Sequence, residues 1–158
     1  NDVIKILNNE FNKYWTREKE DRLRQIKMSK KDVIILASIV EREAVSDEER
    51  PIIAGVFLNR LKKRMRLESC ATVLYAMGQN KERLTYEDLE FQSPYNTYRH
   101  FGLPPAPICN PGAKAIDAVL FPATTNSLYF VSKGNGTHFF SDTLEGHVKN
   151  KKLSKKKQ

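Results

Sequence analysis

The chain has 158 residues, of which 40% are hydrophobic and 29% charged, and its formal net charge is +8. These values are ordinary for a globular protein and fit one domain with at most a small appendage. No apolar run approaches the roughly 20 residues that a membrane-spanning helix needs, and the N-terminus lacks a signal-peptide pattern.

The positive charge is concentrated at the C-terminus. Residues 149–158 contain six lysines and no acid, so the remainder of the chain carries only about +2 (8 − 6). This composition is typical of a disordered, solvated tail, with a nucleic-acid or membrane-binding arm as the alternative. Because the rest of the sequence has no helix-turn-helix, RNP or zinc pattern, we do not expect nucleic acid as a partner.

The N-terminal half is predicted to be helical. Residues 2–26 begin with apolar residues at helical spacing and continue into a charged, exposed stretch. Ser29 and Asp32 resemble a capping box at the start of a strongly apolar helix that continues to about Ala44. Pro51 follows a second start signal, Ser46-Asp47-Glu48-Glu49, and opens another helix.

Shorter elements follow in the second half. We expect short helices over 72–77, closed by Gly78, and over 85–89. Residues 91–107 are rich in Pro and Gly and should form an ordered loop. Asn110-Pro111 then predicts the N-cap and first position of a further helix.

A β-hairpin is predicted near the C-terminus, because residues 128–132 and 137–141 flank the turn sequence Gly134-Asn135-Gly136. The fold class is therefore α+β, with a helical core and a small antiparallel sheet. We divide the chain into an N-terminal charged helix (1–28), a main domain (29–148) and the basic tail (149–158).

Glu43 is the first candidate for chemistry. On a helical projection it falls between Leu36 and Ile39 on the apolar side, whereas Glu41 points toward the side of Ser38 and Arg42. Loss of hydration disfavours a charged carboxylate, so such a glutamic acid can remain protonated and donate a proton. The alternative is a structural glutamate that reaches solvent or pairs with an arginine such as Arg60.

The segment SPYNTYRHFGLPP, residues 93–105, is the second candidate feature. Tyr95 and Tyr98 could stack on sugar rings, while Asn96, Thr97 and Arg99 could bind polar substituents. A structural loop whose tyrosines cover the core is an equally good interpretation at this point.

Histidines and cysteines give weaker signals. His100, His138 and His147 lack metal-ligand spacing, and Cys70 and Cys109 form no CxxC pair, so we expect neither a metal nor a cofactor. Whether the two cysteines form a disulfide stays open, because sequence cannot set their separation.

Five blocks of the sequence resemble the endolytic murein transglycosylase family, also called YceG-like. They occur in the family's order and lie within residues 31–147, about three-quarters of the chain. The blocks are LASIVEREA, RPIIAGVFLNRLKKRMRLES, TVLYAMG, SPYNTYRHFGLPPAPICNPG and LYFVSKGNGTHFFS.

The resemblance implies an enzyme that cleaves the β-1,4 bond between N-acetylmuramic acid and N-acetylglucosamine in nascent peptidoglycan. Glu43 matches the family's essential glutamate and would act first as general acid and then as base, leaving 1,6-anhydro ends. Such chemistry needs no second carboxylate, because the sugar's own hydroxyl attacks. The resemblance also implies substrate-binding roles for Asn59, Arg60, Tyr95, Asn96, Thr97, Tyr98 and His138.

Family members are single-pass proteins of the cytoplasmic membrane whose catalytic domain faces the cell wall. By resemblance we expect a membrane anchor outside the given sequence, glycan strands as substrate, and cell-wall synthases as partners. A module that binds peptidoglycan without cleaving it is the alternative function.

Overall fold

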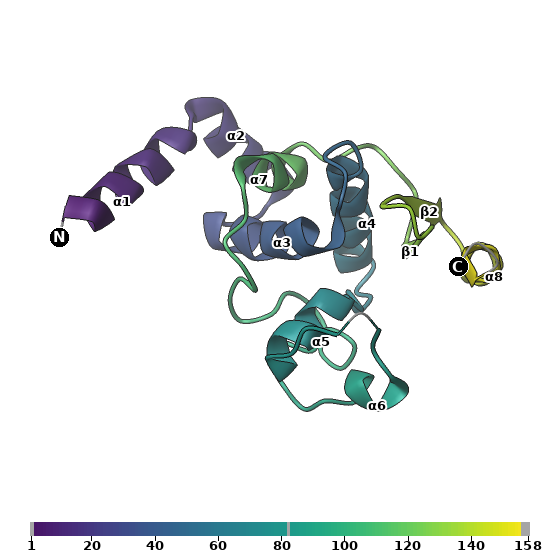
Figure 1. Cartoon of the computed structure of the whole chain (residues 1–158). Coiled ribbons are helices and arrows are strands. Elements are labelled where there is room, and N and C mark those ends of the chain that lie inside the picture. The colour runs from purple at the N-terminus through teal and green to yellow at the C-terminus, as the bar shows by residue number, and fades with distance from the viewer. Residues whose placement is uncertain (1, 82, 156–158) are drawn as a thin grey trace.

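Three helices form the centre of the molecule: α3 (Lys30–Glu43), α4 (Arg50–Lys62) and α7 (Ala113–Leu120). The structure is a computed structural model that describes residues 2–81 and 83–155 (Figure 1). Helix α3 contains the longest continuous buried stretch of the three, because all of residues 35–40 are inaccessible or nearly so. The expected capping box is present, since Ser29 Oγ accepts from the Asp32 backbone N–H and Asp32 accepts from the Ser29 backbone N–H.

Helix α4 carries Pro51 in its first turn, as predicted, and lies against both α3 and α7. Phe57 is buried and meets Phe130 of the hairpin edge-on, with ring centroids 5.6 Å apart. This aromatic contact joins the helical core to the C-terminal sheet and so fixes where the hairpin lies.

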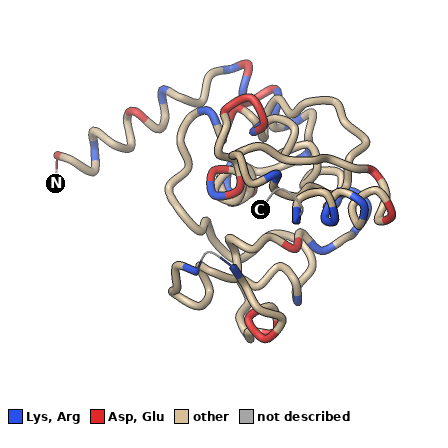
Figure 2. Tube along the Cα trace, turned by 45° about the vertical axis from the view of Figure 1, so that its right-hand side comes forward, with Lys and Arg blue, Asp and Glu red and all other residues tan. Residues whose placement is uncertain are grey.

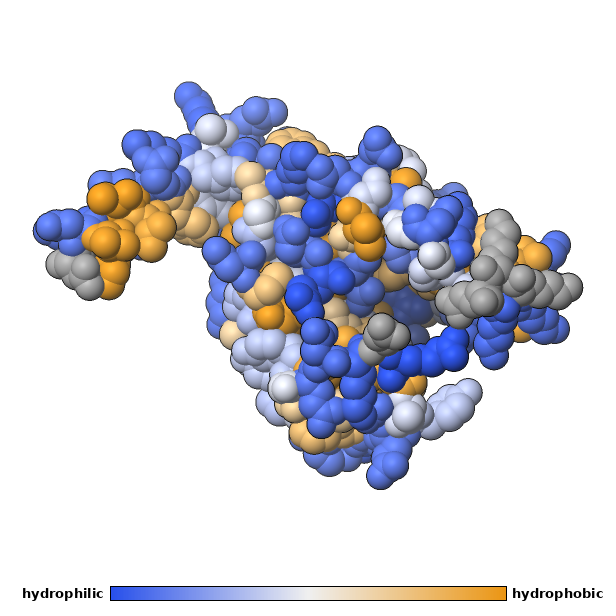
Figure 3. Space-filling model, viewed as in Figure 1, coloured by the Kyte–Doolittle hydropathy of each residue, from blue (hydrophilic) through white to orange (hydrophobic). Residues whose placement is uncertain are grey.

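The N-terminal segment forms two helices, α1 (Asp2–Tyr14) and α2 (Arg17–Ile26), where the sequence pattern predicted one helical stretch. The break occurs because Trp15 turns into the core and Thr16 caps α2 with its side chain. Helix α1 projects from the body, and its apolar side chains remain exposed (Figures 1 and 3). Charges of both signs alternate along it (Figure 2).

The middle of the chain forms a lobe below the core, with α5 (Cys70–Met77) and α6 (Tyr86–Leu89). Gly78 ends α5 in the left-handed conformation, as the sequence predicted. The expected loop over 91–107 is ordered. Helix α7 begins after Gly112 rather than at Asn110, because the backbone is still extended at Gly112 (φ −74°, ψ 166°). The Gly112 N–H donates to the Glu41 carboxylate at 3.0 Å.

Strands β1 (Tyr129–Ser132) and β2 (His138–Ser141) form the predicted antiparallel hairpin, with Phe130 opposite Phe140. The fold class is confirmed: helices dominate, and the described residues contain one two-stranded sheet. No helix among them is both long enough and apolar enough to cross a membrane.

The prediction of a disordered tail from Lys149 is wrong for residues 149–155, which belong to α8 (Leu144–Lys155). This helix packs against both strands of the hairpin. Its lysines lie toward its C-terminal end (Figure 2). Ser154 Oγ donates to the Ser132 carbonyl at 2.6 Å, and the Ser154 side chain is buried. The lysine-rich composition of residues 149–155 did not predict this helix, because tertiary contacts with the hairpin stabilise it. Residues 156–158 of the predicted tail lie outside the described residues.

Gly55 in α4 provides a test of this packing. A Cβ atom there would lie 2.8 Å from Thr125 Cγ2 and 2.9 Å from the Ala123 carbonyl oxygen. Helix propensity favours Ala by about 1 kcal/mol, but overpacking costs about 1–3 kcal/mol. We expect Gly55→Ala to lower the free energy of unfolding, as measured by urea denaturation. An unchanged or higher free energy of unfolding in Gly55→Ala would contradict this account.

Candidate active site

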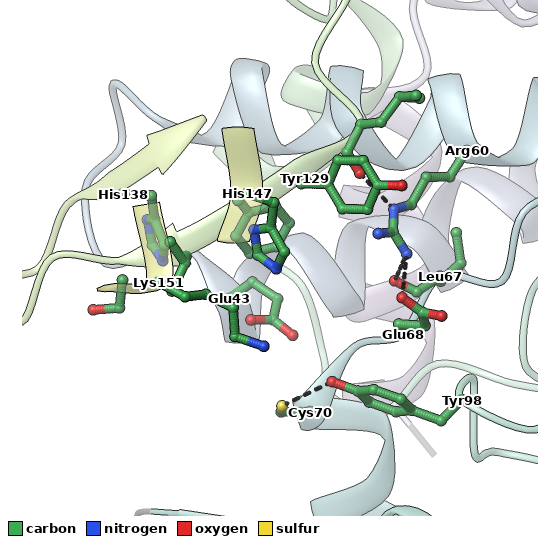
Figure 4. Close-up of a pocket in the computed structure, with 14 residues that line it drawn as sticks. Glu43, Arg60, Leu67, Glu68, Cys70, Tyr98, Tyr129, His138, His147 and Lys151 are labelled. Carbon is green, nitrogen blue, oxygen red and sulfur yellow. Dashed lines mark hydrogen bonds and ion pairs between the residues drawn. The ribbon is translucent and has the colours of Figure 1, made fainter. Parts of the chain in front are cut away.

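A pocket of about 390 Å³ opens where the C-terminal end of α3 meets the hairpin and α8 (Figure 4). Its walls also include the segment between α4 and α5 and the loop that follows α6. Of the predicted site residues, four line this pocket: Glu43, Arg60, Tyr98 and His138. Four segments that are distant in sequence therefore contribute to one cavity.

Glu43 is the last residue of α3, and its carboxyl group lines the pocket while being partly covered. Oε1 accepts a hydrogen bond from Ser69 Oγ and a longer one, 3.5 Å, from the Ala71 backbone N–H. Burial raises the pKa of this carboxyl, although those two hydrogen bonds and nearby His138 and Arg42 oppose the rise. The negative end of the helix dipole acts in the same direction as burial. A glutamic acid in this setting can hold a proton for donation.

Ser69 is itself held by a buried network behind Glu43. Its backbone N–H donates to Thr97 Oγ1 at 3.0 Å, and its carbonyl accepts from Thr72 Oγ1 at 2.7 Å. The two threonine hydroxyls lie 2.8 Å apart. Thr97, which was predicted to contact substrate, is 1% exposed and supports Ser69 from inside the protein. Thr97 therefore supports the site indirectly, because Ser69 lies between it and Glu43.

Arg60 is 6% exposed, and its hydrogen bonds go mainly to backbone carbonyls. Nε donates to Leu128 at 2.6 Å, while Nη1 donates to Arg66 at 2.8 Å and to Leu67 at 3.2 Å. Nη1 also pairs with Glu68 Oε2 at 3.0 Å. The alternative in which Arg60 neutralises Glu43 is not what the structure shows, because the carboxylate that Arg60 pairs with is Glu68.

His138 is the first residue of β2 and lines the pocket, where two contacts with Glu49, the residue before α4, hold it in place. Its Nδ1 lies 2.7 Å from Glu49 Oε2, and its backbone N–H donates to Glu49 Oε1 at 2.9 Å. Phe130 meets the imidazole edge-on, with centroids 5.3 Å apart. This double contact fixes the orientation of the ring, so Nε2 is the nitrogen left for other partners.

Three other predicted substrate residues do not line this pocket. Asn59 Nδ2 donates to the carbonyls of Thr125 (2.7 Å) and Ser127 (3.1 Å), where it fixes the approach to β1. Asn96 is 0% exposed and closes its loop through the carbonyls of Leu89 and Phe91, both at 2.9 Å.

The third of these residues is Tyr95, whose ring centroid lies 4.9 Å from that of Tyr75, outside the cavity. For Tyr95, Asn96 and Thr97 the interpretation as a structural loop fits the contacts, whereas Tyr98 lines the pocket.

Sequence reasoning missed several residues that line the pocket or support it from behind. Ser69 gave no motif signal, and Lys151 was assigned to a tail. His147 stacks on Tyr129 with centroids 5.1 Å apart. Cys70 Sγ lies 3.3 Å from the Tyr98 hydroxyl, and both cysteines are free thiols. Among residues 2–81 and 83–155, no group of three or more His, Cys, Asp or Glu side chains is arranged to hold a metal ion.

The side chain of Glu41, two residues before Glu43, does not line the pocket. It accepts from Gly112 and pairs with Arg50 Nη2 at 3.1 Å, so it joins α3 to α7 and α4. The prediction that these two glutamates point to different sides of α3 is confirmed. Ser38, placed on the polar side of the projection, is fully buried and accepts from the Ile108 N–H at 3.0 Å.

The two glutamates also provide a matched stability test. Because the folded-state pKa of Glu43 lies above its ordinary value of 4.5, the folded protein loses stability as pH rises through that pKa. Glu43→Gln should therefore raise the melting temperature at pH 8 by roughly 2–4 °C, or about 1 kcal/mol, with little difference below pH ~4. Glu41→Gln, which weakens an ion pair, should lower it at pH 8. Equal effects of the two substitutions in thermal scans would contradict the assigned environments.

Known proteins share much of this sequence. The chain is 44% identical over 150 residues to the endolytic murein transglycosylase of Bacillus subtilis (strain 168), across 95% of this chain and 41% of that protein. It is 34% identical over 125 residues to the endolytic murein transglycosylase of Streptococcus pneumoniae (strain D39), across 75% of this chain and 23% of that protein. It thus spans well under half the length of either relative.

A crystal structure of a yceG-like protein from Listeria monocytogenes superimposes with a TM-score of 0.76 at 46% identity, covering 84% of this chain and 43% of that one. The model of the YceG-like family matches residues 1–153. The resemblance noted in the sequence is therefore confirmed, and this chain belongs to the YceG-like family.

Proposed function

We propose that this chain is the catalytic part of a lytic transglycosylase that cuts peptidoglycan glycan strands endolytically. The observation that carries the proposal is Glu43, a carboxyl whose pKa is raised by burial and which faces a cavity large enough for a sugar unit. Support comes from the relatives named endolytic murein transglycosylase. A module that only binds glycan would gain nothing from a desolvated acid, which costs stability.

The proposed reaction uses one carboxyl group twice. Protonated Glu43 donates to the glycosidic oxygen as the bond from the muramic acid C1 breaks and positive charge develops on the sugar. The Glu43 carboxylate then takes the proton of the same sugar's C6 hydroxyl while O6 bonds to C1. Glu43 is thereby regenerated as the acid, no water is consumed, and one strand end becomes a 1,6-anhydro sugar. Tethering of O6 to the same ring supplies its effective concentration.

Hydrolysis is the second candidate, because the structure places another carboxylate, Glu68, in the same pocket. Two acids are what an ordinary glycosidase needs. We favour transglycosylation since Glu68 is paired with Arg60 at 3.0 Å, which leaves it poorly placed to activate water.

The name of the relatives refers to murein, the cell-wall polymer, which supports a substrate outside the cytoplasm. We infer that the protein acts on the outer face of the cytoplasmic membrane, held there by a single-pass anchor that lies outside the described residues. Association with cell-wall synthases belongs to the same proposal, and co-purification from detergent-solubilised membranes tests it.

Product analysis is the direct test. Purified glycan strands are incubated with the wild-type protein and with Glu43→Gln, and the ends are identified by mass spectrometry. We expect 1,6-anhydro ends from the wild type and a rate at least about 10³-fold lower from the variant, because a general acid–base contributes roughly 10²–10⁴ in each step. Reducing ends would instead support hydrolysis with Glu68. Anhydro ends at equal rates from both proteins would exclude Glu43 as the acid.

The pH dependence of the wild-type rate provides a second test. Since Glu43 must be protonated to donate, the rate should fall as pH rises through its pKa, which burial places above 4.5. A rate that halves already between pH 4 and 5 would show that the carboxyl titrates as if exposed. The measurement is the initial rate across pH 4–9, with folding checked at each pH by circular dichroism.

A further inference from the structure

The pocket contains four side chains that can carry positive charge among the residues the structure describes: Arg60, His138, His147 and Lys151. Arg60 is committed to Glu68 and to three backbone carbonyls. His138 is held by Glu49 through Nδ1. These two side chains therefore have partners within the protein and hold the walls of the cavity in place.

His147 stacks on Tyr129, and its pKa is lowered, mainly by burial and then by the charges of Lys151 and Arg60. It is therefore a neutral imidazole near pH 7. The Lys151 ammonium group has no hydrogen bond or ion pair with any residue in 2–81 or 83–155, which distinguishes it from the Arg60 and His138 side chains. Figure 4 shows its side chain extending from α8 across the cavity toward Glu43 and Cys70.

The position of Lys151 on α8 accounts for this orientation. It follows His147 by four residues, so both side chains lie on the face of α8 that lines the pocket. Lys152, the next residue, lies on another face with Leu144, Glu145 and Val148, along a separate shallow groove. One lysine of this basic helix is thus directed into the active-site cavity while its neighbour faces away from it.

The charge balance of the cavity leaves Lys151 uncompensated. Glu68 is neutralised by Arg60, and Glu43 is uncharged whenever it is ready to act as an acid. In the reactive state of the pocket, the Lys151 ammonium group therefore has no carboxylate partner among the described residues. A positive charge in a partly enclosed cavity attracts an anionic ligand more strongly than one on an open surface.

We propose that Lys151 binds a carboxylate of the substrate and thereby makes the pocket selective for glycans that carry an acidic substituent beside the scissile bond. This inference rests on the proposed function and refines its substrate class. In a murein strand the carboxylate comes either from the lactyl ether of a peptide-free muramic acid or from the stem peptide attached there. A chitin strand has the same β-1,4 backbone and no carboxylate.

Binding measurements separate this inference from catalysis. Titration calorimetry uses the full chain carrying Glu43→Gln, so that ligands are not cleaved, with Lys151→Met or the control Lys152→Met added. The ligands are a neutral chitin oligosaccharide, a peptide-free murein oligosaccharide of the same length, and its peptide-bearing form. We expect Lys151→Met to weaken binding of a carboxylate-bearing ligand about tenfold, since a charge-assisted hydrogen bond is lost. Lys152→Met should change no affinity.

The two murein ligands identify the source of the carboxylate. An effect of Lys151→Met on the peptide-free strand assigns the lactyl group, and an effect on the peptide-bearing strand alone assigns the stem. Equal losses for the chitin ligand, or equal effects of the two lysine substitutions, would overturn the inference. Failure of the proposed function is recognised separately, by the absence of anhydro ends with the wild-type protein, and selective loss of acidic-ligand binding in Lys151→Met would still support the site.

Discussion

Glu43 sits at the end of a helix that cannot move without disrupting the core. Helix α3 begins at a complete capping box, buries residues 35–40 against α4 and α7, and ends at this carboxyl group. Because the preceding turns are fixed, the side chain cannot withdraw to solvent by a shift of the backbone. The desolvation that raises its pKa is therefore enforced by the hydrophobic core itself.

The surrounding structure can be understood as support for that carboxyl. Ser69 donates to Glu43 and is held in turn by Thr97 and Thr72, while Asn96 closes the loop that carries Thr97. Polar side chains in this loop are buried and satisfied by hydrogen bonds, which is how a polar segment can lie inside a protein. The polar loop residues Asn96 and Thr97 thus act on the site through Ser69 rather than through the cavity.

The hairpin and α8 complete the cavity from the opposite side. Phe57 holds the hairpin against α4, Glu49 orients His138, and α8 brings Lys151 over the opening. An acid that is neutral in its reactive form therefore shares the cavity with the basic side chain of Lys151. This asymmetry matches a substrate whose reacting bond is neutral and whose substituent is anionic.

Local signals in the sequence determined most of the helices, the hairpin and the choice between Glu43 and Glu41, because caps, turns and periodicity depend on near neighbours. The resemblance to the family was equally visible there. Only the tertiary structure separated supporting residues such as Asn96 and Thr97 from those that face the cavity, and only it showed α8 as a helix.

The decisive partners are far apart in the chain: Glu43 meets Ser69 across 26 residues, and Glu49 meets His138 across 89. No local pattern encodes such pairs. They arise when the core fixes where each segment lies, which is why the lysine that enters the pocket could not be distinguished by sequence from its neighbours.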